Sequence, residues 1–218
     1  AVVGELVTRQ SIEQLARAYS AWAESRGFES TVVDDRHGAD AGEDALALFV
    51  AGAGAHALLA GETGLHTFVR RGEQRHGPRR EERDVVAVEV LRVPPETAWP
   101  AAGELACDVR ALRDARGRLA NVPLCEVRFV HRKSRASVVA WCPAHADEAE
   151  ERALPLVAAR LARPAPANPR LVRRYTTGAN PEVRDRRTGH ASPRVARVLA
   201  GELDEFLVWA RAADGRCA

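Results

Sequence analysis

The stretch Gly61–Arg83, GETGLHTFVRRGEQRHGPRREER, decides the fold that the sequence predicts. Its first part favours a turn at the glycines and then a short strand over Leu65–Val69. The part after Val69 is rich in arginine and has almost no apolar residue. Such a segment cannot contribute to a hydrophobic core, so we expect it to face water or an anionic partner.

The order of residues in this stretch resembles a known family. Glu62–Arg70, ETGLHTFVR, is similar to the E-T-G-V-H-R-L-V-R run of bacterial class I peptide chain release factors. In that family the loop that follows carries the tripeptide that reads the stop codon, and Gly77–Arg80 resembles its closing G-G-R-R. The family has S-P-F or P-x-T at the tripeptide and a His after the arginines. This chain has at those positions Glu73, Gln74, Arg75 and then Glu81.

Further runs resemble the same family, in the same order along the chain. Ala18–Phe28 is similar to a helix that reads R-W-A-E-x-R-G-F, and Leu199–Leu207 to a terminal helix that reads V-L-D-G-x-L-D-x-F-I. Between them, Arg173–Tyr175 and Arg187–Gly189 resemble R-S-Y and R-T-G. The family's long N-terminal helical domain has no counterpart here. The resemblance covers nearly the whole chain and implies an α+β, release-factor-like fold.

The family's small second domain carries a G-A-G-G-Q loop, which enters the peptidyl transferase centre and supports hydrolysis of peptidyl-tRNA. The corresponding loop here is Asp114–Arg118, DARGR, in which Arg116 stands at the first glycine of GGQ, Gly117 matches, and Arg118 stands at the glutamine. The flanking residues that match at the family's spacing are Leu105, Asp108, Val109, Asn121, Val127, Arg128 and His131. The resemblance makes Gly117 and Arg118 the candidate catalytic residues of a degenerate loop.

The chemistry of this loop depends on its backbone. Two glycines allow conformations closed to other residues, and a backbone N–H at the glutamine position can stabilise developing negative charge. The side chain of Arg116 restricts the loop, and loss of one such donor typically costs on the order of 10²–10³ in rate. Two interpretations stay open: Arg118 stabilises a tetrahedral intermediate by its charge, or the loop is a solvated turn without a catalytic role. The changed tripeptide favours the second.

The arginine-rich segment also has two interpretations. A run of charge is usually a solvated face, and here Glu73, Glu81 and Glu82 neutralise part of it. The alternative, which we favour, is sequence-independent contact with RNA phosphates. The candidate RNA-binding residues are Arg70, Arg71, Arg75, His76, Arg79, Arg80 and Arg83.

The periodicity of the first half predicts one helix and several strands. Ser11 opens the helix in a capping-box pattern, and Gly27 ends it. Strands are predicted over Phe28–Asp34 and Ala45–Val50. The run Val85–Val93 is apolar on both faces, which is typical of a strand in the middle of a sheet.

The second half predicts a smaller unit of strands and one helix. Strands are expected over Leu105–Leu112, Glu126–Val130 and Ser137–Cys142, and a helix is expected over Ala149–Ala162. Pro155 would kink this helix unless the helix begins near Ala153, because a proline is tolerated in a first turn. Proline-rich segments flank this unit. We therefore predict a larger discontinuous domain with a mixed sheet, residues 1–97 completed by 165–218, and a small sheet-and-helix domain, residues 98–164.

Composition narrows the choice of function. The formal net charge is only +2 over 218 residues, so nucleic-acid affinity must come from local patches. No apolar run is long enough to span a bilayer and no signal peptide is recognisable, so we expect a cytoplasmic protein that binds no membrane.

Cys142–His145 is a lone CxxH, which is more often a buried thiol beside a histidine than a zinc site, so we expect no metal and no cofactor. The sequence does not begin with Met, so the question of whether a segment precedes it is left open.

Three hypotheses follow. The chain is a release-factor homologue, in translation termination or ribosome rescue, that binds ribosome, tRNA or other RNA as a monomer and is impaired in hydrolysis. Alternatively, it hydrolyses peptidyl-tRNA or a related ester through the remodelled loop. In the third case, it is a protein-interaction module on an inherited scaffold.

Overall fold

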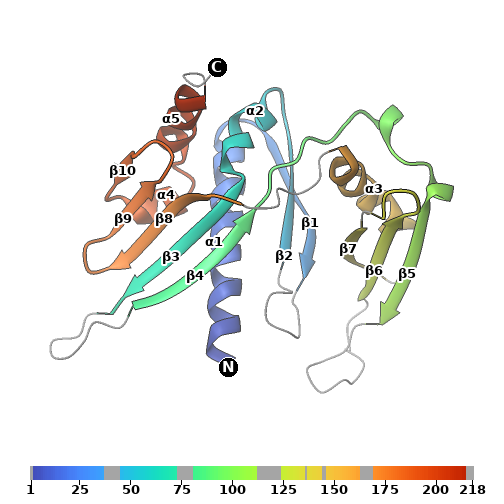
Figure 1. Cartoon of the computed structure of the whole chain (residues 1–218), viewed down its shortest axis with the longest axis horizontal. Helices are drawn as coiled ribbons and strands as arrows, with labels where there is room; N and C mark the ends of the chain where they lie inside the picture. Colours follow the sequence, from blue (N-terminus) through green and yellow to red (C-terminus); the bar gives the residue numbers. More distant parts are fainter. Residues whose placement is uncertain are drawn as a thin grey trace. The chain divides into compact units, whose positions relative to one another are not determined.

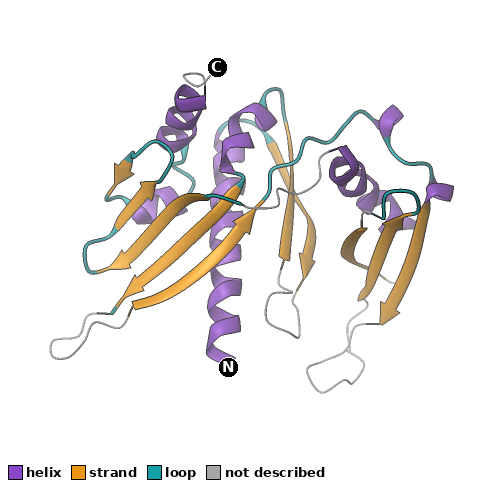
Figure 2. Ribbon diagram, viewed as in Figure 1, coloured by secondary structure: helices purple, strands orange, loops and turns teal. Residues whose placement is uncertain are grey.

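The computed structural model describes residues 2–36, 45–72, 81–111, 124–135, 137–143, 146–162 and 169–214 (Figure 1). Contacts divide the chain into two compact units. The first joins residues 1–31, 48–90 and 166–218, and the second joins residues 32–47 and 91–165. Each unit mixes helices and strands (Figure 2), so the predicted α+β class is confirmed.

The first unit begins with helix α1 (Val2–Ser25). The predicted start at Ser11 is wrong, because the residues from Val2 onward are also helical. Ser11 therefore lies inside the helix, where it is buried. The predicted end is confirmed. Gly27 has a φ of +72°, and the N–H of Phe28 donates to the carbonyl of Ala23 at 2.9 Å, which is the pattern of a Schellman motif.

Helix α1 leads into a two-stranded sheet of β1 (Glu29–Arg36) and β2 (Ala45–Ala51). The short helix α2 (Ala55–Leu59) and a 3₁₀ turn (Ala60–Glu62) follow. Both predicted strands are therefore present. The helix and the 3₁₀ turn connect β2 to the next strand, at whose end the arginine-rich segment begins.

A five-stranded sheet is the centre of the first unit. Its order is β10–β9–β8–β3–β4, and β3 and β8 are parallel while the other pairs are antiparallel, so the predicted mixed sheet is confirmed. The strands are β3 (Gly64–Arg71), β4 (Glu81–Val88), β8 (Leu171–Gly178), β9 (Glu182–Asp185) and β10 (Ala191–Ser192).

Strand β4 lies at an edge of this sheet, so the prediction of a central strand over Val85–Val93 is wrong. Its side chains alternate: Asp84 and Val86 are buried, whereas Val85 is 46% exposed. An edge strand of an antiparallel pair can leave one face in water, and a continuous apolar run does not exclude this.

The core of the first unit lies on one face of the sheet. Phe68 and Tyr175 from neighbouring strands stack with ring centroids 4.7 Å apart. Helices α1, α4 (Val195–Leu199) and α5 (Asp204–Asp214) pack onto this face. The buried core residues are Leu15, Trp22, Ala23, Leu59, Phe68, Val86, Tyr175, Val183, Val195, Val198, Leu203, Phe206 and Leu207.

The second unit contains a three-stranded antiparallel sheet, in the order β5 (Leu105–Ala111), β6 (Leu124–His131) and β7 (Ser137–Pro143), and helix α3 (Ala146–Ala162). Val157 of the helix joins Leu105, Val127 and Phe129 in a separate core. The helix begins at Ala146 and not near Ala153, so Pro155 lies within it. Continuous packing of the apolar stripe against the sheet outweighs the hydrogen bond that the proline removes.

No helix in the described part of the chain has both the length and the apolar character needed to cross a membrane.

Candidate functional site

The predicted RNA-binding segment connects β3 to β4. The strands pair in register from Gly64 opposite Val88 to Arg71 opposite Glu81, so the two ends of the segment are held together. Of the candidate RNA-binding residues, Arg70, Arg71 and Arg83 belong to these strands. The remaining candidates Arg75, His76, Arg79 and Arg80, together with the codon-loop residues Glu73, Gln74 and Arg75, lie outside the described residues.

The three described arginines point to two sides of the hairpin. Arg70 lies on the core side, and its guanidinium donates to Oε1 of Gln10 in α1 at 3.1 Å. Arg71 lies on the other side and forms an ion pair with Glu81 across the hairpin at 3.7 Å. Arg83 shares that side with Arg71 and is exposed. The hairpin thus carries arginines on both sides near the arginine-rich segment, with Arg70 opposite Glu82 and Arg71 opposite Glu81.

The candidate catalytic residues Gly117 and Arg118, like Arg116 before them, also lie outside the described residues. Their flanks form the antiparallel pair β5–β6, in which Asp108 is opposite Arg128 and Val109 is opposite Val127. His131 closes the pair opposite Leu105, and its Nδ1 accepts a hydrogen bond from the N–H of Ser134 at 3.2 Å. The matched flanking residues that the structure describes are therefore parts of one hairpin stem, and Asn121 lies outside the described residues.

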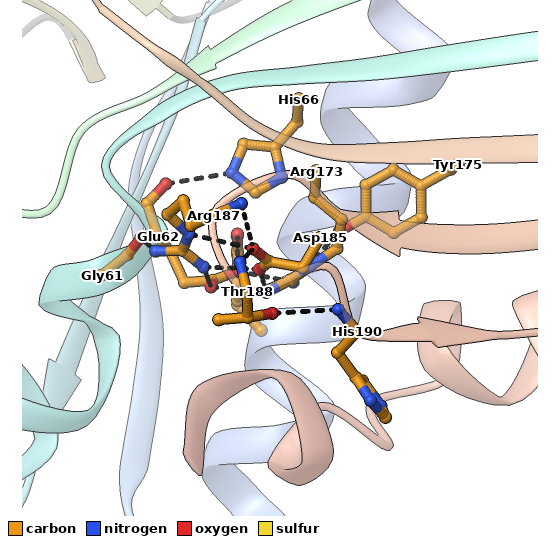
Figure 3. Close-up of polar contacts among 10 residues, drawn as sticks. Gly61, Glu62, His66, Arg173, Tyr175, Asp185, Arg187, Thr188 and His190 are labelled. Carbon is orange, nitrogen blue, oxygen red and sulfur yellow. Dashed lines mark hydrogen bonds and ion pairs between the residues drawn. The ribbon is translucent and has the colours of Figure 1, made fainter. Parts of the chain in front are cut away.

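A buried polar cluster lies at the start of β3, and the sequence interpretation missed it. The guanidinium of Arg173 donates to both carboxylate oxygens of Glu62, at 2.7 Å each, and both side chains are fully buried (Figure 3). The guanidinium carbon of Arg173 also lies 4.5 Å from the ring centroid of Phe206, which adds a cation–π contact from α5.

The last residue of β9, Asp185, and the loop after this strand supply the rest of the cluster (Figure 3). Arg187 donates to Asp185 at 2.7 Å and to Glu62 at 3.4 Å, and it also donates to the carbonyl of Gly61. Asp185 in turn accepts from Arg173 at 3.4 Å and from the N–H of Thr188 at 3.2 Å. Two carboxylates thus balance two guanidinium groups, which is the condition for holding charge in a buried place.

The cluster sets the ionisation of its members. Burial raises the pKa of Glu62, but the charge of Arg173, its hydrogen bond and the charge of Arg187 outweigh this, so the pKa of Glu62 lies below the usual value. Burial lowers the pKa of His66 to about 4, so the imidazole is neutral near pH 7. Its Nε2 then donates to the carbonyl of Glu62 at 2.9 Å. Burial raises the pKa of Tyr175 to about 12.

These contacts join three distant parts of the chain. Glu62 precedes β3, Arg173 is in β8, Asp185 ends β9 and Arg187 lies just after it. The hydroxyl of Tyr19, in α1, donates to the carboxylate of Glu62 at 3.0 Å. The cluster therefore fixes the parallel pairing of β3 and β8, and with it the strand that leads into the arginine-rich segment. The signal available in the sequence was that Glu62, Arg173 and Arg187 fall within the runs that resemble release factors, but it gave them no role.

The start of β3 also depends on Gly64. Its φ is +143°, and a Cβ at this position would lie 2.4 Å from the carbonyl oxygen of Arg170. The N–H of Leu65 donates to the same carbonyl at 2.8 Å. A glycine is thus required where the chain turns into β3 beside the segment before β8.

Metal binding finds no support in the described residues, where no three His, Cys, Asp or Glu side chains gather as ligands would. The CxxH of the sequence ends at His145, which lies outside them.

Comparisons with known proteins agree with this geometry. Residues 9–81, which include α1 and β3, match the PCRF domain family. The structure is similar to that of RF2 of Thermus thermophilus, with a TM-score of 0.75, 27% sequence identity and 94% of this chain covered. The chain spans 64% of the length of that protein chain. The sequence runs, the mixed sheet and these matches together support a protein of the release factor family.

Proposed function

We propose that the chain is a release-factor-like protein of translation termination or ribosome rescue, which binds the ribosome and tRNA and is impaired in hydrolysis of peptidyl-tRNA. The observation that carries the proposal is the β3–β4 hairpin: it holds the ends of an arginine-rich segment at the family's codon-reading position. The planar guanidinium group of arginine can donate two parallel hydrogen bonds to the phosphate oxygens of RNA.

The position of the segment supports binding without codon reading. Glu73, Gln74 and Arg75 replace the stop-reading tripeptide, so the segment lacks the residues with which the family reads a codon. The arginines around them make contact with any phosphate backbone in reach, independent of its sequence. We therefore propose that affinity for the ribosome is kept while preference for a stop codon is lost.

Impaired hydrolysis follows from the loop Arg116-Gly117-Arg118. A residue with a Cβ at position 116 restricts the backbone that must place an N–H beside the developing negative charge. An active hydrolase that works through the charge of Arg118 is the alternative, and a repurposed interaction module is a further one. The two experiments below separate all three.

Binding is tested by cosedimentation with ribosomes whose A site is empty, across a range of salt concentrations. The expected result is association that weakens steeply with salt, because it rests on contacts with phosphates. Arg79→Gln with Arg80→Gln should weaken it, while Arg194→Gln with Arg197→Gln, which removes the same charge at α4, should not. Absence of cosedimentation at low salt would leave the interaction module as the better explanation.

Hydrolysis is tested with ribosomes that carry labelled peptidyl-tRNA. The wild-type protein should release little peptide, and restoring Arg116→Gly and Arg118→Gln together should increase release if loop geometry was the missing part. If the wild-type protein is already active and Arg118→Gln abolishes release, the remodelled loop is itself catalytic and the proposal of impairment fails.

A further inference from the structure

A second group of arginines lies on the face of the five-stranded sheet that faces away from the core. Side chains alternate along a strand, so residues two apart share a face. In β3 the core face carries His66 and Phe68, and the opposite face therefore carries Thr67, Val69 and Arg71.

The pairing of strands places arginines from three other strands on this same face. Arg83 of β4 is opposite Val69, and Arg174 of β8 is opposite Thr67. Arg184 of β9 is opposite Arg174. We call the set Arg71, Arg83, Arg174 and Arg184 the arginine face.

The arginine face is accessible. The side chains of Arg71 and Arg174 are each 31% exposed and that of Arg184 is 48% exposed. Beneath them, on the same face, Thr67, Val69 and Thr176 are buried. Long arginine side chains commonly cover neighbouring residues with their stems and keep the guanidinium group in water.

Carboxylates neutralise only part of this charge. Glu81 lies between two arginines, 3.7 Å from Arg71 and 3.6 Å from Arg174, and these distances are too long for good hydrogen bonds. Glu182 accepts two hydrogen bonds from Arg184, at 3.0 Å each. Among the described residues, two carboxylates thus face four guanidinium groups, each of which has five N–H donors.

We propose that the arginine face binds the phosphate backbone of RNA and extends the RNA contact from the hairpin segment across the sheet. This inference rests on the proposed function, because it assumes an RNA partner. Arg174 and Arg184 lie directly opposite each other on neighbouring strands, which are about 4.8 Å apart, and Arg71 and Arg83 lie at other levels of the same face. Together the four guanidinium groups offer paired donors to successive phosphates. Arg71 and Arg83 belong to the arginine face and also lie in the strands on either side of the arginine-rich segment. The arginine face is therefore continuous with that segment.

The experiment compares three double variants of the full chain. Arg174→Gln with Arg184→Gln removes charge from the arginine face, and Arg194→Gln with Arg197→Gln removes the same charge at α4. Glu81→Gln with Glu182→Gln does the opposite, because it removes the carboxylates that neutralise the face. Binding to empty-A-site ribosomes and to a fluorescein-labelled fragment of ribosomal RNA is measured at several salt concentrations, and thermal melting checks that each variant is folded.

Loss of Arg174 and Arg184 should weaken binding to both probes and lower the slope of log K against log salt by roughly 1.5, about 0.7–0.9 for each lost phosphate contact. Loss of Glu81 and Glu182 should strengthen binding, which a damaged fold cannot do. If the wild type binds ribosomes but both face variants bind like the control at α4, the arginine face is not used and the proposed function still stands. If the wild type binds neither probe, the face and the proposed function both fail.

Discussion

Arg173 holds Glu62 through two hydrogen bonds of 2.7 Å, although 111 residues separate the two in sequence. The pair joins the start of β3 to β8, and neither side chain is exposed to solvent. Stability of the first unit should therefore depend on this pair far more than on the ion pairs of its surface.

We expect Arg173→Met to destabilise the protein by about 3–5 kcal/mol, because it leaves the charge of Glu62 buried and only partly compensated. Arg184→Met is the matched control: its ion pair with Glu182 is exposed to solvent and should contribute little to stability. Urea unfolding of each variant gives the free energies of unfolding. The double variant Arg173→Met with Glu62→Met should be less destabilised than Arg173→Met alone, and equal stability of Arg173→Met and wild type would refute the role of the pair.

The cluster also predicts how stability depends on pH. Folding lowers the pKa of His66 from its usual 6.5 to about 4, so between these values the unfolded chain binds a proton that the folded chain does not. Stability should therefore fall as the pH decreases through this interval, by about 1.4 kcal/mol for each unit by which the pKa is lowered. Glu62 has a lowered pKa, so its contribution is complete above the usual carboxylate value of 4.5 and is lost below it.

His66→Gln separates the two effects. The glutamine amide can still donate to the carbonyl of Glu62, but it does not titrate. Thermal melting between pH 7.5 and pH 4 should show a smaller decrease for the variant than for the wild type, while the decrease at lower pH remains in both. Parallel curves for the two proteins would show that His66 does not contribute.

The turn into β3 gives a test of backbone conformation. Gly64→Ala should destabilise the protein by roughly 1–3 kcal/mol, because φ is +143° and the new Cβ would meet the carbonyl oxygen of Arg170. Gly103→Ala is the control, since a Cβ there would have no heavy atom within 4 Å. Chemical denaturation measures both, and equal midpoints for the two variants would show that the start of β3 adjusts without cost.

Sequence reasoning predicted the parts of the fold that local patterns determine. The apolar run Leu65–Val69 predicted β3, and Gly27 predicted the end of α1, because a strand and a helix C-cap depend on near neighbours. It misplaced β4, whose apolar residues read as central although the strand lies at the sheet edge. Whether a strand is central depends on its partners, and the pairing of β3 with the distant β8 is not visible in any local run.

The buried cluster was missed for a related reason. Isolated Glu, Arg and Asp residues are read as surface residues, because they are almost never fully buried unless they are paired. Glu62, Arg173 and Asp185 become neighbours only when the parallel pair β3–β8 forms and β9 adds to its edge. The candidate residues of the two loops, in contrast, came from the resemblance, and their roles stay predictions.

Pro155 offers a test in the second unit, where it interrupts the hydrogen bonds of α3. Alanine at this position would supply an N–H for the carbonyl of Glu151, one turn earlier, and remove the clash of the proline ring with that turn. Pro155→Ala should therefore stabilise the unit, by an amount of up to about 3 kcal/mol, the difference in helix propensity between the two residues. Pro95→Ala, in the extended segment before the 3₁₀ turn Glu96–Ala98, should instead be neutral or slightly destabilising, because it mainly increases the conformational freedom of the unfolded chain. Calorimetry can compare the melting temperatures of the two variants. A lower melting temperature for Pro155→Ala would mean that packing of the proline ring against its neighbours stabilises the unit more than the missing hydrogen bond destabilises it.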